Sequence, residues 1–299
     1  MMTIFDSVAT LLKICETENK LISEVMLDFE VAQKKLTRLE IKKQMKKNLE
    51  VMRAAVADGL KGVTSTTGLT GGGAAKLDAY AKQGATLSGN TMLRAICAAI
   101  AANEVNAAMG IVCAAPTAGS AGTLPGVLFP LETKLNLTED QLINFLFTSG
   151  AFGIITANNA FIAGAAGGCQ AEIGTSSAMA AAAAVEVAGG TPKQSADAFA
   201  IALANMLGLV CDPVAGLVEV PCIKRNAAGA SNALIAADMA LAGLTSEIPA
   251  DEVISAMYEI GIAMPTEFKE TAEGGLANTP TARMIEERIF GEKSPCSSC

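Results

Sequence analysis

Three cysteines stand in settings that suit metal ligands. Cys169 follows two glycines, and Cys211 and Cys222 bound a turn-rich segment with a proline near each end. Glycine and proline permit sharp turns, so the chain can wrap closely and leave backbone N–H groups free beside a thiolate. Thiolates hold iron–sulfur clusters, but this spacing is not the C-x₂-C-x₂-C run of small ferredoxins. The residues by themselves therefore indicate a three-cysteine metal site and leave its kind open.

The other five cysteines have different settings. Cys15, Cys97 and Cys113 lie in apolar helical stretches, where a free cysteine is usually a small core residue. Cys296 and Cys299 form a CxxC pair near the C-terminus, which could be a zinc half-site, a redox pair or two mobile thiols. The sequence contains no His, which excludes Ser–His and Cys–His nucleophiles and histidine-held metals. A proton must therefore move through another residue type or through another chain.

Two glycine-rich stretches combine glycine with hydroxyl residues ahead of expected helices, at 64–73 and 115–122. Free backbone N–H groups and hydroxyls in such loops suit an anion such as a carboxylate or phosphate. Neither stretch has the spacing of a P-loop or of a dinucleotide-binding turn, so tight turns between helices are the alternative interpretation. A third glycine stretch, 164–168, leads directly into Cys169.

The composition favours helices. Half of the 299 residues are apolar, yet aromatic residues make up only 4% and Trp is absent. Alanine, leucine and methionine favour helices, whereas the aromatic strand formers are scarce. We predict an all-α protein with one catalytic domain at 1–290 and a flexible tail at 291–299. Helical stretches are expected at 22–58 (as one helix or two), 90–112, 138–165, 175–188, 192–209, 228–244 and 250–263.

Charge and hydropathy exclude several classes of partner. A net charge of −8 offers no basic field to attract nucleic acid. The N-terminal residues lack the pattern of a signal peptide, so we expect a cytoplasmic protein whose cysteines stay reduced or bind metal. The charge-free stretches 105–131 and 141–171 are long enough to cross a bilayer. Their internal Asn, Pro and Gly, and the missing aromatic flanks, favour buried helices of a protein outside the membrane.

The chain resembles the alpha chain, or catalytic domain, of bacterial iron–sulfur L-serine dehydratases over about residues 20–290. Several blocks in one order carry this resemblance, which makes it more specific than any single motif. The blocks are 62–72, 103–110, 115–122, 167–172, 211–226 and 229–233.

This resemblance implies a [4Fe-4S] cluster on Cys169, Cys211 and Cys222. In some relatives a C-terminal cysteine caps the fourth iron, a role that Cys299 would take here with Cys296 as its competitor. The implied reaction converts L-serine to pyruvate and ammonia, with the open iron acting as a Lewis acid on the β-hydroxyl. Fused relatives carry a further half that this chain lacks, which implies a separate beta chain as partner.

Loop chemistry indicates which residues would surround the substrate. The catalytic candidates are Ser65, Ser120 and Lys224, with an alkoxide of either serine as the expected base. Arg225 would suit a carboxylate best, although Lys224 and Arg225 could equally form a surface pair. The substrate-binding candidates share hydroxyl, amide or guanidinium groups: Thr67, Asn106, Thr117, Arg225, Asn226, Ser231 and Asn232.

Competing interpretations remain open at this point. A pyridoxal-phosphate serine dehydratase would perform the same net reaction, and the stretch 71–76 superficially offers a glycine loop and a lysine. The lysine motif of that family is absent, however. A related cysteine desulfidase would expel hydrosulfide instead of water. A helical scaffold or a membrane protein without enzymatic activity is the alternative from a different class.

Overall fold

The computed structural model describes residues 5–84 and 86–291, and it is all-α, as the sequence predicted. Within these residues, β pairing is limited to isolated bridges between Thr64 and Gly71 and between Cys211 and Lys269. The longer helices are α1 (Val8–Glu18), α2 (Ile22–Lys34), α3 (Arg38–Lys61), α4 (Gly73–Lys82), α5 (Asn90–Ala107), α6 (Thr123–Leu135), α7 (Glu139–Asn159), α9 (Thr175–Val187), α10 (Pro192–Ala204), α11 (Cys222–Leu241), α12 (Ala250–Ala263) and α13 (Pro280–Phe290). The short elements are α8 (Gly164–Gly167), the π-helix η1 (Gln170–Gly174) and the 3₁₀ helices η2 (Val214–Gly216), η3 (Thr266–Phe268) and η4 (Gly275–Asn278).

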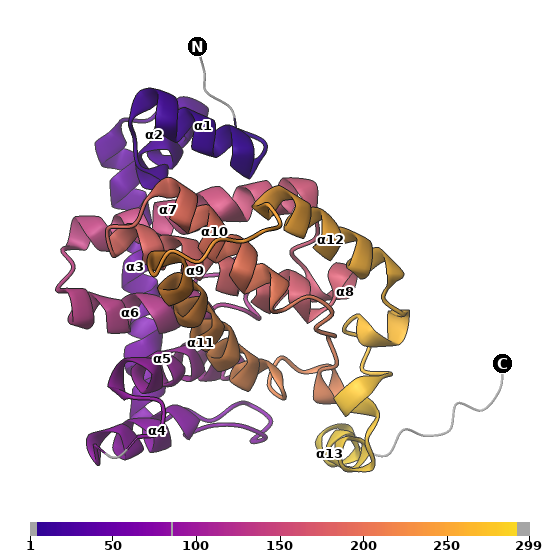
Figure 1. Cartoon of the computed structure of the whole chain (residues 1–299). Coiled ribbons are helices and arrows are strands. Elements are labelled where there is room, and N and C mark those ends of the chain that lie inside the picture. Colours follow the sequence, from indigo (N-terminus) through magenta and orange to yellow (C-terminus); the bar gives the residue numbers. More distant parts are fainter. Residues whose placement is uncertain (1–4, 85, 292–299) are drawn as a thin grey trace.

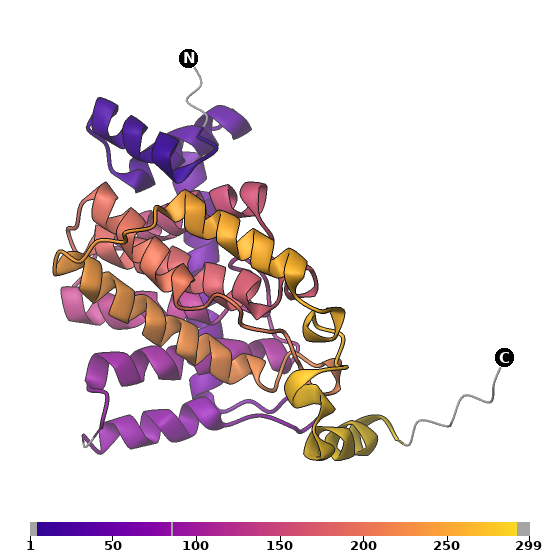
Figure 2. The same cartoon turned by 45° about the vertical axis from the view of Figure 1, so that its right-hand side comes forward.

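Helix α9 forms the centre of the core. All of its residues from Thr175 to Glu186 are buried, and seven consecutive small or flexible apolar residues, 178–184, fill its middle. A helix that is apolar on every side must be enclosed by others. Helices α6, α7, α10 and α11 all pack against α9, and the views in Figures 1 and 2 show it in the middle of the bundle.

The expected helix at 22–58 consists of two helices. α2 ends where Lys35 takes a left-handed backbone conformation, and α3 begins after the N-cap Thr37, whose capping box with Glu40 fixes the start. The long α3 then runs behind the bundle from the N-terminal helices to α4 (Figure 1). Its lysines face solvent, where Lys42 pairs with Asp140, in keeping with a solvated face.

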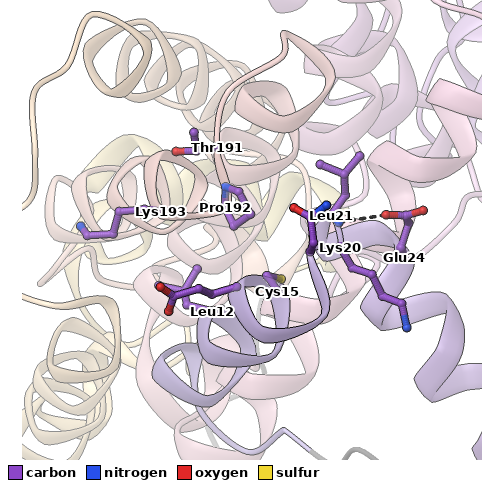
Figure 3. A pocket seen from close by; sticks show the side chains of 10 residues that line it. Leu12, Cys15, Lys20, Leu21, Glu24, Thr191, Pro192 and Lys193 are labelled. Atoms are coloured by element: carbon purple, nitrogen blue, oxygen red, sulfur yellow. Dashed lines mark hydrogen bonds between the residues drawn. The ribbon is translucent and has the colours of Figure 1, made fainter.

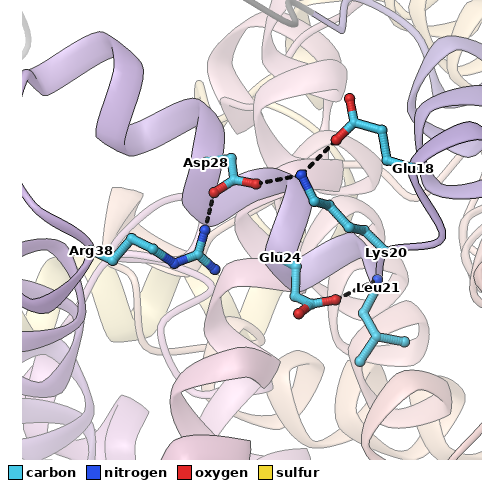
Figure 4. Close-up of polar contacts among 6 residues, drawn as sticks. All are labelled: Glu18, Lys20, Leu21, Glu24, Asp28 and Arg38. Carbon is cyan, nitrogen blue, oxygen red and sulfur yellow. Dashed lines mark hydrogen bonds and ion pairs between the residues drawn. The ribbon is translucent and has the colours of Figure 1, made fainter.

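Surface charges join the N-terminal helices to one another. Lys20 contacts Glu18 at 2.6 Å and Asp28 at 3.0 Å, and Arg38 from α3 reaches the same Asp28 (Figure 4). The Glu24 carboxylate accepts the Leu21 N–H at 2.9 Å and caps α2. These side chains are partly exposed, so each ion pair contributes little to stability.

A cavity of about 560 Å³ lies between α1, α2 and the start of α10 (Figure 3). Cys15, Lys20 and Lys193 are among the residues that line it. None of the predicted site residues lines this cavity, and Lys193 is already paired with Asp197. The functional site therefore has to be sought elsewhere.

Some helices differ from the sequence expectation. α6 was not predicted because Pro125 and Pro130 lower the helix propensity of its sequence. It forms nevertheless, since residues 123–131 except Phe129 are buried as α6 packs against α5, α9 and α11, and packing overrides propensity. α11 starts at Cys222, six residues before the expected position, and α1, α4 and α13 were not anticipated. No helix in the part of the chain described here is long and apolar enough to cross a membrane.

A buried carboxylate on α9 anchors α2. Glu186 accepts the Ile22 N–H at 2.9 Å and the Thr148 hydroxyl at 2.7 Å. Burial raises the pKa of Glu186 above its ordinary value of 4.5, even though these hydrogen bonds oppose the shift. The folded state therefore holds this proton more tightly than the unfolded chain does.

From this shift we predict a pH dependence of stability. The free energy of unfolding should fall as the pH rises from the ordinary pKa through the raised one, because the folded state must then carry a buried charge. Urea unfolding between about pH 5 and pH 8 should show a smaller fall for Glu186→Gln than for the wild type. Equal slopes for the two proteins would contradict this assignment.

Candidate active site

The three predicted cysteines come together from separate segments. Cys169 lies between α8 and η1, Cys211 follows α10, and Cys222 is the first residue of α11. They are 2%, 3% and 8% exposed. The thiol of Cys211 donates a hydrogen bond to the sulfur of Cys169. A negative charge on Cys169 raises the pKa of Cys222, which places Cys222 close to the other two. The fold therefore gathers all three sulfurs in one buried pocket.

A glycine makes room for this pocket. A Cβ atom at Gly164 would lie 2.8 Å from the Cys211 Sγ and 3.0 Å from a carboxylate oxygen of Glu172. Real Cβ atoms do not approach other atoms so closely, so a larger residue here would displace the sulfur or the carboxylate. This packing explains why a glycine stretch precedes Cys169.

The pocket favours one thiolate over the other two. The pKa of Cys169 is lowered, first by the hydrogen bond from Cys211 and also by the nearby Arg225 guanidinium. The pKa of Cys211 is raised because its thiol donates that bond and is buried. Burial raises the pKa of Cys222 to about 12. The Arg225 guanidinium thus favours the negatively charged form of Cys169.

Arg225 is fixed by protein groups. Its guanidinium forms an ion pair with Asp212 at 2.8 Å and donates to the Val210 carbonyl at 2.8 Å. Asp212 also accepts the Leu276 N–H at 2.7 Å, which ties the C-terminal segment to the pocket. Lys224, the next residue along α11, is exposed. The two residues therefore do not form a surface pair, because Arg225 turns inward and supports the cysteines.

The segment after α12 covers Cys211. The Cys211 N–H donates to the Phe268 carbonyl, and the Glu270 N–H donates to the Cys211 carbonyl, both at 2.8 Å. In Figure 2 this segment descends along one side of the bundle from α12 to α13. The tail residues Cys296 and Cys299 lie outside the described residues.

The loop at 115–122 adjoins the pocket through Glu172. The Thr117 hydroxyl donates to this carboxylate at 2.8 Å and lies 3.1 Å from the Ser120 hydroxyl. Burial raises the pKa of Glu172, and its oxygens also lie close to Gly164. Ser120 is fully buried and donates to the Ala115 carbonyl at 3.2 Å. The predicted residues Thr117 and Ser120 thus lie at the site, next to a carboxylate.

Asn226 holds this loop against α11. Its side-chain oxygen accepts the Gly122 N–H at 3.0 Å, and its amide donates to the Gly119 carbonyl at 2.8 Å. The side chain is fully buried and also bonds Thr123 and the Cys222 carbonyl. With its polar atoms all occupied, Asn226 positions the loop.

The loop at 64–71 reaches the same segment through Glu219. The hydroxyls of Thr67 and Thr70 both donate to this buried carboxylate, the first at 2.7 Å. Ser65 lies 3.1 Å from Thr67, hydroxyl to hydroxyl. The predicted residues Ser65 and Thr67 are therefore joined to the 211–222 segment that carries two of the cysteines.

Other predicted residues lie apart from this cluster or have other partners. Asn232 bonds Ser177, Ala202 and Asn205 and lies about three helical turns beyond Cys222 on α11. The Ser231 hydroxyl donates to the Ala227 carbonyl four residues earlier on the same helix, at 2.9 Å. Asn106 is half-buried in the last turn of α5.

Sequence reasoning missed three carboxylates of the site: Glu172, Glu219 and Asp212. Each lies within three residues of a predicted cysteine, and that proximity was the available signal. Among the described residues no three His, Cys, Asp or Glu side chains are arranged around a single metal ion. In an iron–sulfur cluster each thiolate binds a different iron, so a cluster site does not require three donors around one ion.

Several known proteins are similar to this chain in sequence. A family model described as the serine dehydratase alpha chain matches residues 17–277. A probable L-serine dehydratase alpha chain of Bacillus subtilis is 63% identical over 287 residues, 96% of each chain. The L-serine dehydratase alpha chain of Peptoniphilus asaccharolyticus is 41% identical, covering 94% of this chain and 97% of the relative. The L-serine dehydratase of Haemophilus influenzae is 38% identical, covering 89% of this chain and 60% of that protein.

The fold and site define an all-α protein in which buried cysteines and two hydroxyl-bearing loops meet. Within that class, the chain belongs to the serine dehydratase alpha chain family. The resemblance inferred from the sequence blocks is confirmed, and so is the expectation of a family of lyases, because the named relatives are dehydratases.

The Asn226 contacts lead to a stability prediction. Asn226→Ala should lower the free energy of unfolding by about 2–4 kcal/mol, because it leaves several buried polar groups without partners. Lys224→Ala, an exposed change on the same helix turn, is the control and should change stability by less than about 0.5 kcal/mol. Denaturant unfolding of the two variants measures both effects, and equal stabilities would contradict the role of Asn226.

Proposed function

We propose that this chain is the catalytic alpha chain of an L-serine dehydratase whose [4Fe-4S] cluster is held by Cys169, Cys211 and Cys222. The observation that carries the proposal is the convergence of three buried sulfurs from separate segments. The names of the relatives support serine as the substrate and a dehydration as the reaction.

The donor set fits such a cluster. Three buried thiolates beside one guanidinium would leave negative charge uncompensated, and a metal centre supplies the missing positive charge. The six described cysteines are all free thiols, which supports a reducing compartment such as the cytoplasm. Cys299 stays a proposed cap for the fourth iron.

When bound, the cluster would supply a Lewis-acidic iron for the β-hydroxyl of serine. The chain's own groups have separate tasks. Arg225, held by Asp212 and Val210, keeps a positive charge beside the sulfurs. Ser65, Thr67 and Thr117, on loops that bond Glu219 and Glu172 near the cysteines, would orient the amino acid.

We assign the acceptance of the substrate's α-proton to Glu172. It is a carboxylate next to the cysteines whose hydrogen-bond donor from the 115–122 loop is Thr117. Ser120, an expected base, is fully buried behind Thr117. Loss of the α-proton and of water from serine leaves an aminoacrylate, which hydrolyses to pyruvate and ammonia.

We further propose that a beta chain completes the enzyme. Two relatives that match this chain over nearly their full length are themselves named alpha chains. A chain without histidine also has fewer groups for proton transfer. Pyruvate release from serine, with and without the neighbouring subunit, measures its contribution, and parallel assays with cysteine and threonine define the leaving group.

The cluster assignment predicts a metal content. Anaerobically reconstituted wild-type protein should hold about four iron and four sulfide per chain. Cys169→Ser, Cys211→Ser and Cys222→Ser should each lose most of the iron. Cys97→Ser, which alters a buried cysteine in a separate apolar cluster, is the matched control and should keep it. Full iron in all three site variants would refute the assignment.

If Glu172 accepts the proton, its replacement should lower turnover without changing the iron content. Glu172→Gln keeps the shape of the side chain but removes the proton acceptor, so kcat should fall about 10²-fold or more at unchanged iron content. Glu259→Gln changes an exposed acidic residue on α12 and, as the control, should retain activity. A Glu172→Gln protein with wild-type kcat would show that the proton goes elsewhere.

A further inference from the structure

Glu219 joins the two halves of the site. It is 5% exposed and lies three residues before Cys222. Its two carboxylate oxygens accept hydrogen bonds from the hydroxyls of Thr67 and Thr70, which lie 152 and 149 residues earlier. A buried carboxylate is costly unless such bonds satisfy it, so this contact strongly favours one position of the 64–71 loop.

The carboxylate also decides the direction of the hydrogen bonds in the loop. Each hydroxyl has one proton and two acceptor lone pairs. Thr67 gives its proton to Glu219 and accepts the Leu69 N–H at 3.1 Å. In the 3.1 Å contact between the Ser65 and Thr67 hydroxyls, Ser65 must therefore be the donor.

These contacts determine which further hydrogen bonds the Ser65 hydroxyl can form. Its proton goes to Thr67, and one lone pair accepts the Thr70 N–H at 3.3 Å. The hydroxyl can then accept one more hydrogen bond but cannot donate one. Such a group suits the ammonium of an amino acid and not its carboxylate.

We propose that Glu219 is a positioning residue that orients the hydroxyls of the 64–71 loop so that Ser65 accepts a hydrogen bond from the α-ammonium group of the substrate. This inference rests on the proposed function, because it takes the substrate to be an amino acid bound beside the three cysteines. The Thr70 hydroxyl bonds Glu219, and the Thr70 N–H that donates to Ser65 is a backbone group that a side-chain change leaves in place, so Thr70 is the residue of choice for a test.

Thr70→Val removes the hydroxyl that donates to Glu219 and keeps the shape of the side chain. The loop then occupies its binding position for only part of the time, and the apparent affinity for serine falls by that fraction. The KM for serine should rise roughly 10-fold or more, the effect expected from losing a hydrogen bond to a buried charge. At saturating serine, kcat should stay within about twofold of the wild type, because the bound substrate restores the loop position.

Matched variants and one ligand complete the experiment on the reconstituted protein with its partner subunit. Thr70→Ser restores the hydroxyl and should return KM to within about twofold of the wild type. Glu219→Gln leaves one acceptor oxygen for two donors and should raise KM at least as much as Thr70→Val. The inhibition constant of 3-hydroxypropanoate, which lacks the ammonium group, should not change in Thr70→Val.

Three outcomes would overturn the inference. A lower kcat at unchanged KM in Thr70→Val and Glu219→Gln would show that the contact between Thr70 and Glu219 only stabilises the fold, since misfolded protein reduces the active fraction. Unchanged kinetics in both would show that the contact is dispensable. An equal rise in the inhibition constant of 3-hydroxypropanoate in Thr70→Val would show that the loop binds a substrate group other than the ammonium. Absence of serine turnover by the wild type would instead reject the proposed function.

Discussion

The architecture of the site depends on one buried ion pair. Arg225 and Asp212 have side chains that are 16% and 4% exposed, and burying two charges costs more than their attraction returns unless further hydrogen bonds satisfy them. Here the Val210 carbonyl and the Leu276 N–H provide such bonds. The pair therefore holds together α11, the segment after α10 that carries Cys211, and the C-terminal segment.

Other buried carboxylates also hold separate elements together through hydrogen bonds. Glu104 accepts the N–H groups of Gly73 and Ala74 at the start of α4, and Glu186 does the same at α2. Glu172 and Glu219 accept hydroxyls from the two glycine-rich loops. Where an alanine-rich helix such as α9 packs against its neighbours, it offers few large side chains with which to interlock. Directed hydrogen bonds to carboxylates supply the missing specificity of position.

This arrangement links the fold to the chemistry. The loops that would orient an amino acid are attached to the residues that flank the cysteines, Glu172 after Cys169 and Glu219 before Cys222. A shift of either cysteine segment would move the corresponding loop. The proposed substrate-binding groups and metal ligands would thereby be held in fixed relative positions, which is what a reaction between a bound hydroxyl and a metal centre would require.

The sequence by itself determined the helical class from its composition and the start of α7 from its capping residues. It also singled out three cysteines and two glycine-rich loops by their local spacing. The family blocks also marked 167–172 without revealing that Glu172 contacts Thr117, 55 residues away. Only the tertiary structure decided that contact, the inward turn of Arg225 and the distance of Asn232 from the site. Such contacts depend on how helices pack and which way each side chain points, and no local pattern encodes that.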